Sequence, residues 1–128
     1  MSKPCKIEVT GVSKIFRRNG KDVEALAQTN LAVQEGHFAC IIGPSGCGKS
    51  TLFNIIAGLL PPTTGDVTID GKSIVCKAGT VGYMLQKDLL LPWRTILDNI
   101  ILGLEIRGVP RSQAVERALP LMEKYGLK

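Results

Sequence analysis

The sequence has no long apolar segment and no targeting segment. No run of apolar residues approaches the ~20 residues that a bilayer-spanning helix needs. The first residues do not follow the order of positive charge, apolar stretch and small residues that marks a secretory signal. We therefore expect a soluble chain that does not itself cross a membrane.

Cysteines at a recognisable spacing are also lacking. None of the four cysteines stands in a C-x-x-C pair or at the cysteine-to-histidine spacing of a zinc site. They are Cys5, Cys40, Cys47 and Cys76. The sequence therefore predicts neither a disulfide framework nor a metal site built on cysteine, and free thiols are typical of a reducing compartment.

Aromatic residues are few, with three Phe, two Tyr and one Trp. The 16 Lys and Arg residues contribute to a net charge of +5, but they are spread along the whole chain. A nucleic-acid surface combines clustered basic residues with aromatic side chains that stack on bases. We therefore expect the basic residues to form a solvated face, and we expect no nucleic-acid partner.

The composition that remains is that of a folded protein. The chain has 128 residues, of which 45% are hydrophobic and 21% are charged. These proportions are ordinary for a globular protein. The length suits one modest domain or a piece of a larger one.

The most informative segment is a glycine-rich loop that matches the phosphate-binding pattern G-x-x-x-x-G-K-[ST] at every required position. Such a loop binds phosphate through backbone N–H groups, which requires backbone conformations that glycine adopts without a Cβ penalty. A helix follows, so its first N–H groups and the positive end of its dipole also face the anion. The predicted phosphate-binding residues are Gly43, Pro44, Ser45, Gly46, Cys47, Gly48, Lys49, Ser50 and Thr51.

Two side chains of this loop have specific predicted roles, and the flanking segments provide the required context. Lys49 is expected to reach the β- and γ-phosphates, and the Ser50 hydroxyl is expected to ligate Mg²⁺. Residues 38–42 form a continuous apolar run, typical of a strand buried on both faces. Apolar residues at helical spacing after the loop predict a helix. They are Leu52, Ile55, Ile56 and Leu59, with Gly58 as the stop.

The segment ahead of the loop predicts a small antiparallel β unit. Residues 5–16 alternate apolar and polar, and residues 23–26 and 30–33 resume strand-like patterns. Between the first two of these segments stands Asn19-Gly20, a dipeptide that favours a tight hairpin turn.

The chain after the first helix predicts three more short strands and then two helices. Residues 67–75 indicate two strands joined at Asp70-Gly71, and residues 81–85 indicate another. Thr95 caps the first helix, with Asp98 three residues later and an end near Gly108, and Ser112 caps the second, which Pro120 should kink or split.

With these segments in place, the chain resembles the N-terminal half of the ATP-binding subunit of ATP-binding-cassette (ABC) transporters. The phosphate loop alone indicates only a P-loop nucleotidase, whereas its combination with several other segments is more specific. These are Val12-Ser13-Lys14-Ile15-Phe16, Gln34-Glu35-Gly36, Ile56-Ala57-Gly58-Leu59, Thr64-Gly65-Asp66-Val67 and Asp70-Gly71. Residues 90–100 look like the corresponding segment of bacterial importers for nitrate, sulfonates or taurine.

The resemblance implies an α/β fold, the P-loop NTPase core of an ABC ATPase. It adds an N-terminal antiparallel β subdomain and the start of a helical subdomain, so the domain is incomplete. Residues 1–86 would form the nucleotide-binding core with the β subdomain. Residues 87–128 would form the Q-loop segment and the start of the helical subdomain.

The resemblance also implies roles for two residues outside the loop. Phe16 stands where the family has the aromatic that stacks on adenine, more often Tyr, and a phenyl face stacks as well. Gln86 stands at the Q-loop position, where it would touch the metal or the attacking water and pass the nucleotide state to the permease. The implied catalytic residues are Lys49 and Gln86, the implied metal contacts are Ser50 and Gln86, and the implied cofactors are ATP and Mg²⁺.

Partners and location follow from the same resemblance. It implies an energy-coupling subunit that works with membrane permease subunits, with a second ATP-binding subunit in a dimer and, indirectly, with a solute-binding protein. Such a subunit would be peripheral, on the cytoplasmic face of the membrane.

The resemblance stops short of the family's remaining catalytic groups. An acidic strand with a metal Asp and a catalytic Glu, a switch histidine and a Ser-Gly-Gly signature do not occur after Gln86, and the single histidine, His37, precedes the loop. We therefore expect a fragment or truncated chain that binds nucleotide, while hydrolysis belongs to the full-length family. The alternatives are a non-hydrolysing nucleotide-binding fragment or another P-loop enzyme, such as a small kinase or GTPase. Against a GTPase, the sequence has no Asn-Lys-x-Asp run.

Overall fold

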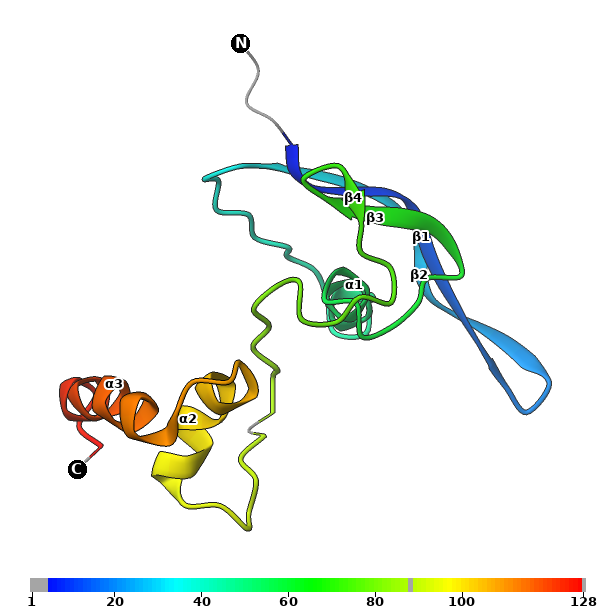
Figure 1. Cartoon of the computed structure of the whole chain (residues 1–128). Coiled ribbons are helices and arrows are strands. Elements are labelled where there is room, and N and C mark those ends of the chain that lie inside the picture. The colour runs from blue at the N-terminus through cyan, green and yellow to red at the C-terminus, as the bar shows by residue number, and fades with distance from the viewer. Residues whose placement is uncertain (1–4, 88, 128) are drawn as a thin grey trace. The chain divides into compact units, whose positions relative to one another are not determined.

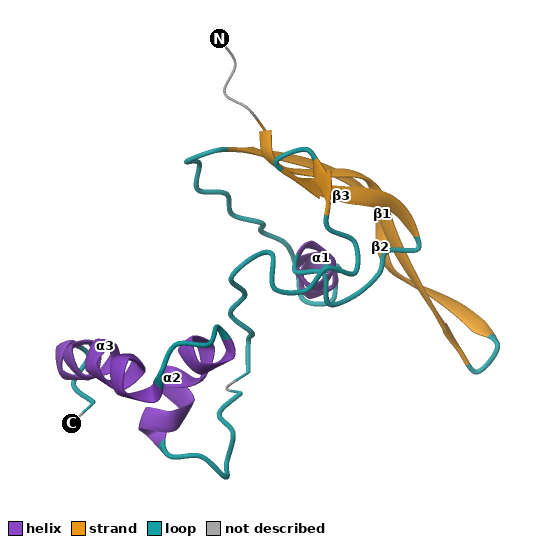
Figure 2. Cartoon of the chain, in the orientation of Figure 1, coloured by secondary structure: helices purple, strands orange, loops and turns teal. Residues whose placement is uncertain are grey.

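The computed structural model describes residues 5–87 and 89–127, and it divides the chain into two units, Met1–Tyr83 and Met84–Lys128. The sequence analysis predicts two segments, residues 1–86 and 87–128. Residues 1–4 of the first, and 88 and 128 of the second, lie outside the described residues. The elements, drawn in Figure 1 and Figure 2, are β1 (Cys5–Arg18), β2 (Lys21–Gln34), α1 (Lys49–Ile56), β3 (Thr64–Ile69), β4 (Lys72–Ser73), α2 (Ile96–Ile106) and α3 (Arg111–Lys124).

The first unit contains an antiparallel sheet with the strand order β2-β1-β3-β4. The turn between β1 and β2 is the predicted Asn-Gly turn, in which Asn19 has a φ of 51° and Gly20 a φ of 73°. Two residues with positive φ match the twist of a tight hairpin. The two predicted segments after this turn merge into one strand of 14 residues, because β1 supplies a pairing partner along its whole length.

The core of the first unit lies between this sheet and α1. It joins four buried side chains of β1, β2 and β3 to two of the helix and to Ile74, which follows β4. The members are Val9, Val12, Leu26, Leu52, Ile55, Val67 and Ile74. The predicted helix after the loop is thereby confirmed, and it ends before Gly58, whose φ of 72° no longer continues a helix. Leu59 lies beyond the helix and is half exposed.

Two strands predicted from apolar runs are not formed. Residues 38–42 and 81–85 are neither helix nor strand, and Phe38 and Ile42 are 95% and 91% exposed. A strand needs a neighbour to accept and donate its backbone hydrogen bonds. In the described part of the chain, no strand pairs with either run. The prediction of a strand buried on both faces is therefore wrong for this chain, although Ile41 packs against the core.

The second unit consists of α2 and α3, which pack through Ile101, Ala114 and Ala118. Thr95 caps α2 as predicted, because its Oγ1 accepts a hydrogen bond of 3.1 Å from the Asp98 N–H. The predicted cap of the second helix is wrong. The N-cap residue of α3 is Pro110 rather than Ser112, since the first turn already begins at Arg111.

Pro120 does not split α3, which continues for 14 residues. A proline inside a helix removes one backbone hydrogen bond, here the one to the Glu116 carbonyl. Both residues are exposed, so water can satisfy that carbonyl. Within the described residues, no helix has the length and apolar content that crossing a membrane requires.

Candidate functional site

The glycine-rich loop runs directly into the first turn of α1. Gly46 and Gly48 have φ values of 82° and 93°, in the left-handed region that favours glycine. A Cβ on Gly48 would lie 2.6 Å from the Ala25 carbonyl oxygen, so the loop approaches β2 too closely for any side chain. Gly43 does not have a positive φ. It serves the loop differently, because a Cβ there would lie 2.8 Å from Cys47 Sγ.

The start of α1 presents backbone donors. The first helical hydrogen bond runs from the Leu52 N–H to the Gly48 carbonyl, at 2.9 Å. The N–H groups of Lys49, Ser50 and Thr51 therefore have no acceptor within the helix. The first turn also contains no acidic residue that would compete for these donors. This combination of free N–H groups and a helix dipole suits an anion.

Lys49 folds back over the loop that precedes it. Its Nζ donates hydrogen bonds to the carbonyls of Gly43, at 2.7 Å, and Pro44, at 2.6 Å, and lies 3.4 Å from Cys47 Sγ. The ammonium and the backbone donors thus belong to one short segment. A group with several negatively charged oxygens fits this segment, because the same residues supply a positive charge and several N–H donors.

Ser50 is the one predicted metal contact in this unit, and its side chain is exposed on the first turn of α1. Among the described residues, no group of three or more His, Cys, Asp or Glu could hold a metal ion. Mg²⁺ usually takes only one or two protein oxygens and completes its shell with phosphate oxygens and water. A single hydroxyl therefore fits Mg²⁺ that arrives with a nucleotide, rather than a permanent metal centre.

Phe16 lies on β1, opposite Val23 of β2. Its side chain is 41% exposed, and the Lys14 ammonium lies 5.1 Å from the centre of its ring. The loop touches the same hairpin, because Gly48 abuts β2 at Ala25. The β1–β2 hairpin therefore supports both the aromatic side chain and the end of the loop.

Gln86 belongs to the second unit, in the exposed connection ahead of α2. Lys49 and Ser50 belong to the first unit, so the predicted site residues are divided between the two units. Tyr83, the last residue of the first unit, donates a 3.0 Å hydrogen bond from its hydroxyl to Asn54 Oδ1 on α1.

Asn99 organises the loop ahead of α2, a role that the sequence analysis missed. Its Nδ2 donates hydrogen bonds to the carbonyls of Leu91, Arg94 and Thr95, at 3.2, 3.2 and 2.9 Å. Its Oδ1 accepts a 2.8 Å hydrogen bond from the Leu91 N–H. The available signal was a polar residue of low helix propensity among the apolar residues of this helix.

Charged side chains connect the same loop to α2, and α2 to α3. Arg94 pairs with Glu105, and Arg111 Nη2 lies 2.6 Å from Asp98 Oδ1. Hydrogen bonds from the Thr95 hydroxyl and from Arg111 hold the pKa of the Asp98 carboxyl below its usual value.

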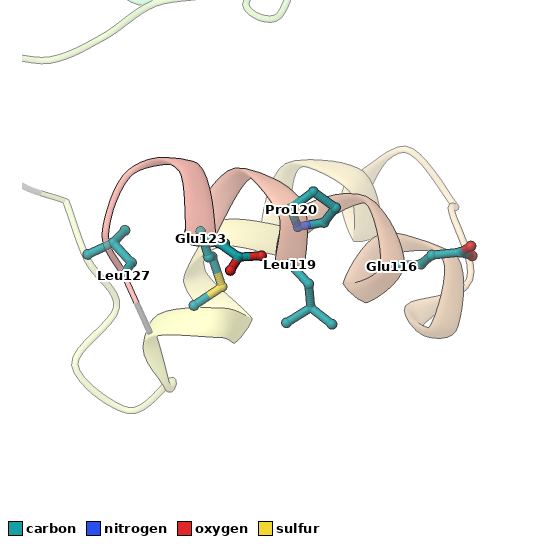
Figure 3. A pocket seen from close by; sticks show the side chains of 6 residues that line it. Glu116, Leu119, Pro120, Glu123 and Leu127 are labelled. Carbon is teal, nitrogen blue, oxygen red and sulfur yellow. The ribbon is translucent and has the colours of Figure 1, made fainter.

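A groove of about 540 Å³ lies along α3 (Figure 3). It contains none of the predicted site residues. Its lining is mostly apolar, with two carboxylates, and consists of Glu116, Leu119, Pro120, Met122, Glu123 and Leu127. Glu116, Leu119, Pro120 and Glu123 lie on the side of α3 away from Ala114 and Ala118, whereas Met122 lies one turn after Ala118 and Leu127 lies beyond the helix.

Comparison with known proteins identifies the family of this chain. The family model described as ABC transporter matches residues 26–128. This chain belongs to the ABC transporter family. Its fold is that of part of an ABC cassette. It superimposes on the dimeric structure of MJ0796, a bacterial ABC transporter cassette, with a TM-score of 0.80 and 32% identity over 91% of this chain and 56% of that one. The MJ0796 structure with ADP and phosphate gives a TM-score of 0.78.

Curated relatives of this ABC family member cover it almost completely. An uncharacterized ABC transporter ATP-binding protein of Methanocaldococcus jannaschii is 44% identical over 96% of the chain, which corresponds to 46% of that relative. A taurine import ATP-binding protein of Rhizobium johnstonii is 44% identical over 86% of the chain, or 42% of that relative. The chain thus spans about half the length of the curated relatives it matches. The family match and the structural match confirm the predicted fold, an incomplete ABC ATPase. The family match also argues against the small kinase and the GTPase that the sequence left as alternatives.

Proposed function

We propose that this chain is the nucleotide-binding part of the ATP-binding subunit of an ABC importer, and that it binds ATP with Mg²⁺. The observation that carries the proposal is the loop of residues 43–48, in which Gly46 and Gly48 are left-handed and the Lys49 ammonium bonds to the Gly43 and Pro44 carbonyls. The free N–H groups of the first turn of α1 follow directly in the chain. This segment matches the needs of a polyphosphate in both charge and hydrogen bonding.

The proposed contacts follow the geometry of the first unit. The backbone of residues 43–51 and the Lys49 ammonium hold the phosphates, and the Ser50 hydroxyl contacts Mg²⁺. Phe16 offers a half-exposed ring for the adenine base. Gln86 is proposed to contact the metal or the attacking water, and residues 1–86 and 87–128 are proposed as the core and the start of the helical subdomain.

The proposed reaction of the full-length subunit is hydrolysis of ATP coupled to transport. The nucleotide supplies a γ-phosphoryl group for transfer to water, a reaction in which positioning and neutralisation of charge dominate the catalysis. Within this chain, Lys49 and the loop N–H groups neutralise and orient the phosphates, while Gln86 is proposed to orient water or sense the metal.

The proposed importer carries a small anion such as taurine, another sulfonate or nitrate. Relatives that are 37–44% identical to the chain are named taurine import ATP-binding proteins, and this supports a substrate of that class. Uptake assays test the substrate in cells that lack their own taurine import ATP-binding subunit. The gene that encodes this chain is expected to restore taurine uptake together with its own permease, and restoration of nitrate uptake alone would contradict a taurine assignment.

The proposed assembly contains membrane permease subunits, a second ATP-binding subunit and, indirectly, a solute-binding protein. The dimeric form of the related cassette MJ0796 supports the pairing of two ATP-binding subunits. The proposed location is therefore peripheral, at the cytoplasmic face of the membrane that holds the permease.

Calorimetric titration of the purified chain with Mg²⁺-ATP tests the central proposal. Lys49→Ala is expected to weaken binding roughly 10- to 100-fold, because it removes a charge-assisted contact to phosphate. Lys72→Ala is the matched control, since it removes an equal charge from the exposed strand β4. Equal affinity of the wild-type and Lys49→Ala proteins would contradict the proposal.

A non-hydrolysing nucleotide-binding fragment is the alternative that the sequence favours for the isolated chain. It predicts binding of ATP without turnover above background. Mg²⁺-dependent phosphate release that disappears in Lys49→Ala would refute this alternative and assign hydrolysis to the chain itself.

A further inference from the structure

We infer that Lys14 positions the aromatic platform on which the adenine base stacks. The inference rests on the proposed ATP-binding function, and it concerns a residue with no assigned role. The Lys14 ammonium lies over the Phe16 ring, 5.1 Å from its centre, and donates a 2.7 Å hydrogen bond to the Pro61 carbonyl. One side chain therefore joins the ring to the segment that follows α1.

The position of Phe16 explains why such a contact matters. The ring lies near the turn of the β1–β2 hairpin, opposite Val23, and it is 41% exposed. Packing alone therefore holds it less firmly than a core side chain. A cation over a ring face is attracted by the quadrupole of that ring. Lys14 stands two residues earlier on the same strand and supplies this attraction.

The anchor of Lys14 is itself well fixed. The segment that contains Pro61 is bonded to β1 by several neighbouring contacts. The Thr63 N–H donates to the Ser13 carbonyl at 2.8 Å, and the Ile15 N–H donates to Thr63 Oγ1 at 2.9 Å. The Ser13 and Thr64 hydroxyls lie 2.7 Å apart. Since this segment follows α1, the contacts link the strand that carries Phe16 to the helix that begins at the phosphate loop.

Two consequences follow for a bound nucleotide. The ammonium occupies one face of the Phe16 ring, so a base stacks on the opposite face. The link through Pro61 holds the ring at a set distance from α1, whose first turn is proposed to bind the phosphates. Lys14 is therefore expected to improve the binding of ligands that contain both a base and phosphates, but not of phosphates alone.

A comparison of ATP with inorganic triphosphate tests this role. Calorimetry gives the affinity of the purified 128-residue chain for each ligand, and their ratio measures the contribution of the nucleoside. Lys14→Met keeps an unbranched apolar stem but loses the ammonium. We expect the ratio to fall roughly two- to fivefold, the size of an exposed cation–π contact, while the affinity for triphosphate stays within error of the wild type.

Two further variants make the result specific. Lys14→Arg retains a cation and a donor and is expected to restore most of the ratio. Lys21→Met removes the same charge at the tip of the same hairpin and is expected to leave the ratio unchanged. Circular dichroism and the retained affinity for triphosphate report that the variants are folded.

The remaining outcomes separate this inference from the proposed function. Equal losses of ATP and triphosphate affinity in Lys14→Met, or an unchanged ratio, would overturn the role of Lys14. If Phe16→Ala lowers the ratio and Lys14→Met does not, only the inference about Lys14 fails. If the wild-type chain binds neither ligand, the proposed function fails and the inference fails with it.

Discussion

Strand β1 and residues 38–42 were both predicted to be strands, but only β1 forms one. Residues 7–9 of β1 pair on one side with β2 and on the other with β3. Residues 38–42 have the more continuous apolar sequence, yet they form no strand, and Phe38 is almost fully exposed. A nearby partner decided the outcome, since backbone groups gain nothing from an extended conformation until another strand pairs with them.

Hydrogen exchange offers the largest contrast between these two regions. The paired amides of residues 7–9 are expected to exchange roughly a thousandfold more slowly than those of residues 39–42, because they open only with the sheet. Exchange of the purified chain followed by nuclear magnetic resonance measures both groups in one sample. Comparable protection of the two regions would show that residues 38–42 pair with a strand.

A matched pair of isoleucines tests the same contrast through stability. Ile55 is fully buried in the core of the first unit, whereas Ile42 is 91% exposed. Ile55→Ala is expected to lower the free energy of unfolding by about 2–5 kcal/mol because it leaves a cavity. Ile42→Ala is expected to change it by less than about 0.5 kcal/mol. Urea denaturation gives both values, and a large loss in Ile42→Ala would show that this run is packed.

Two glycines of the glycine-rich loop show how far the hairpin constrains its backbone. Both have positive φ, but only Gly48 lies against β2, whereas a Cβ on Gly46 would meet open space. Gly46→Ala is expected to cost about 1–2 kcal/mol of stability from backbone strain, and Gly48→Ala roughly 2–4 kcal/mol because a backbone clash is added. Thermal or urea unfolding ranks the two, and equal costs would mean that the hairpin does not constrain the loop.

The loop ahead of α2 is a third case, because side chains hold it in place without a strand partner. Hydrogen bonds from Thr95 and Arg111 lower the pKa of Asp98 in the folded state. The ionised Asp98 carboxylate therefore stabilises the folded state. Its contribution is fully present above the pKa of an aspartate in the unfolded chain, about 3.9, and is lost as the pH falls through the lower pKa of Asp98 in the folded state. The smallest of the four effects is therefore expected below about pH 4, as a loss of helical circular dichroism.

Asp98→Asn is expected to reduce the acid sensitivity that the ionised carboxylate causes. Asp22→Asn is the control, since this exposed residue pairs with Arg17 on the hairpin, at 3.2 Å. An unchanged acid transition in Asp98→Asn, measured against this control, would contradict the role of the carboxylate in the second unit.

Features that depend on neighbours in the sequence were predictable. The phosphate loop is recognisable from its glycines and Lys49, and the hairpin turn from Asn19-Gly20, because backbone conformation at these positions depends on the residues themselves. The Thr95 cap was predictable for the same reason, since its partner is only three residues away. Ser112 was assigned wrongly as a cap because two neighbouring residues are compatible with a helix start, and caps shift by a residue or two.

Tertiary structure alone decided the features that depend on distant residues. No local pattern shows that residues 38–42 and 81–85 lack strand partners, that Lys14 reaches across to Pro61, or that the loop stops against Ala25. Each of these depends on which segments meet in space, and the energy of a pairing or contact exists only once both sides are present. The sequence by itself therefore determined the glycine-rich loop with its lysine and the family of the chain. The fold determined which strands form around it and which side chains support the aromatic ring.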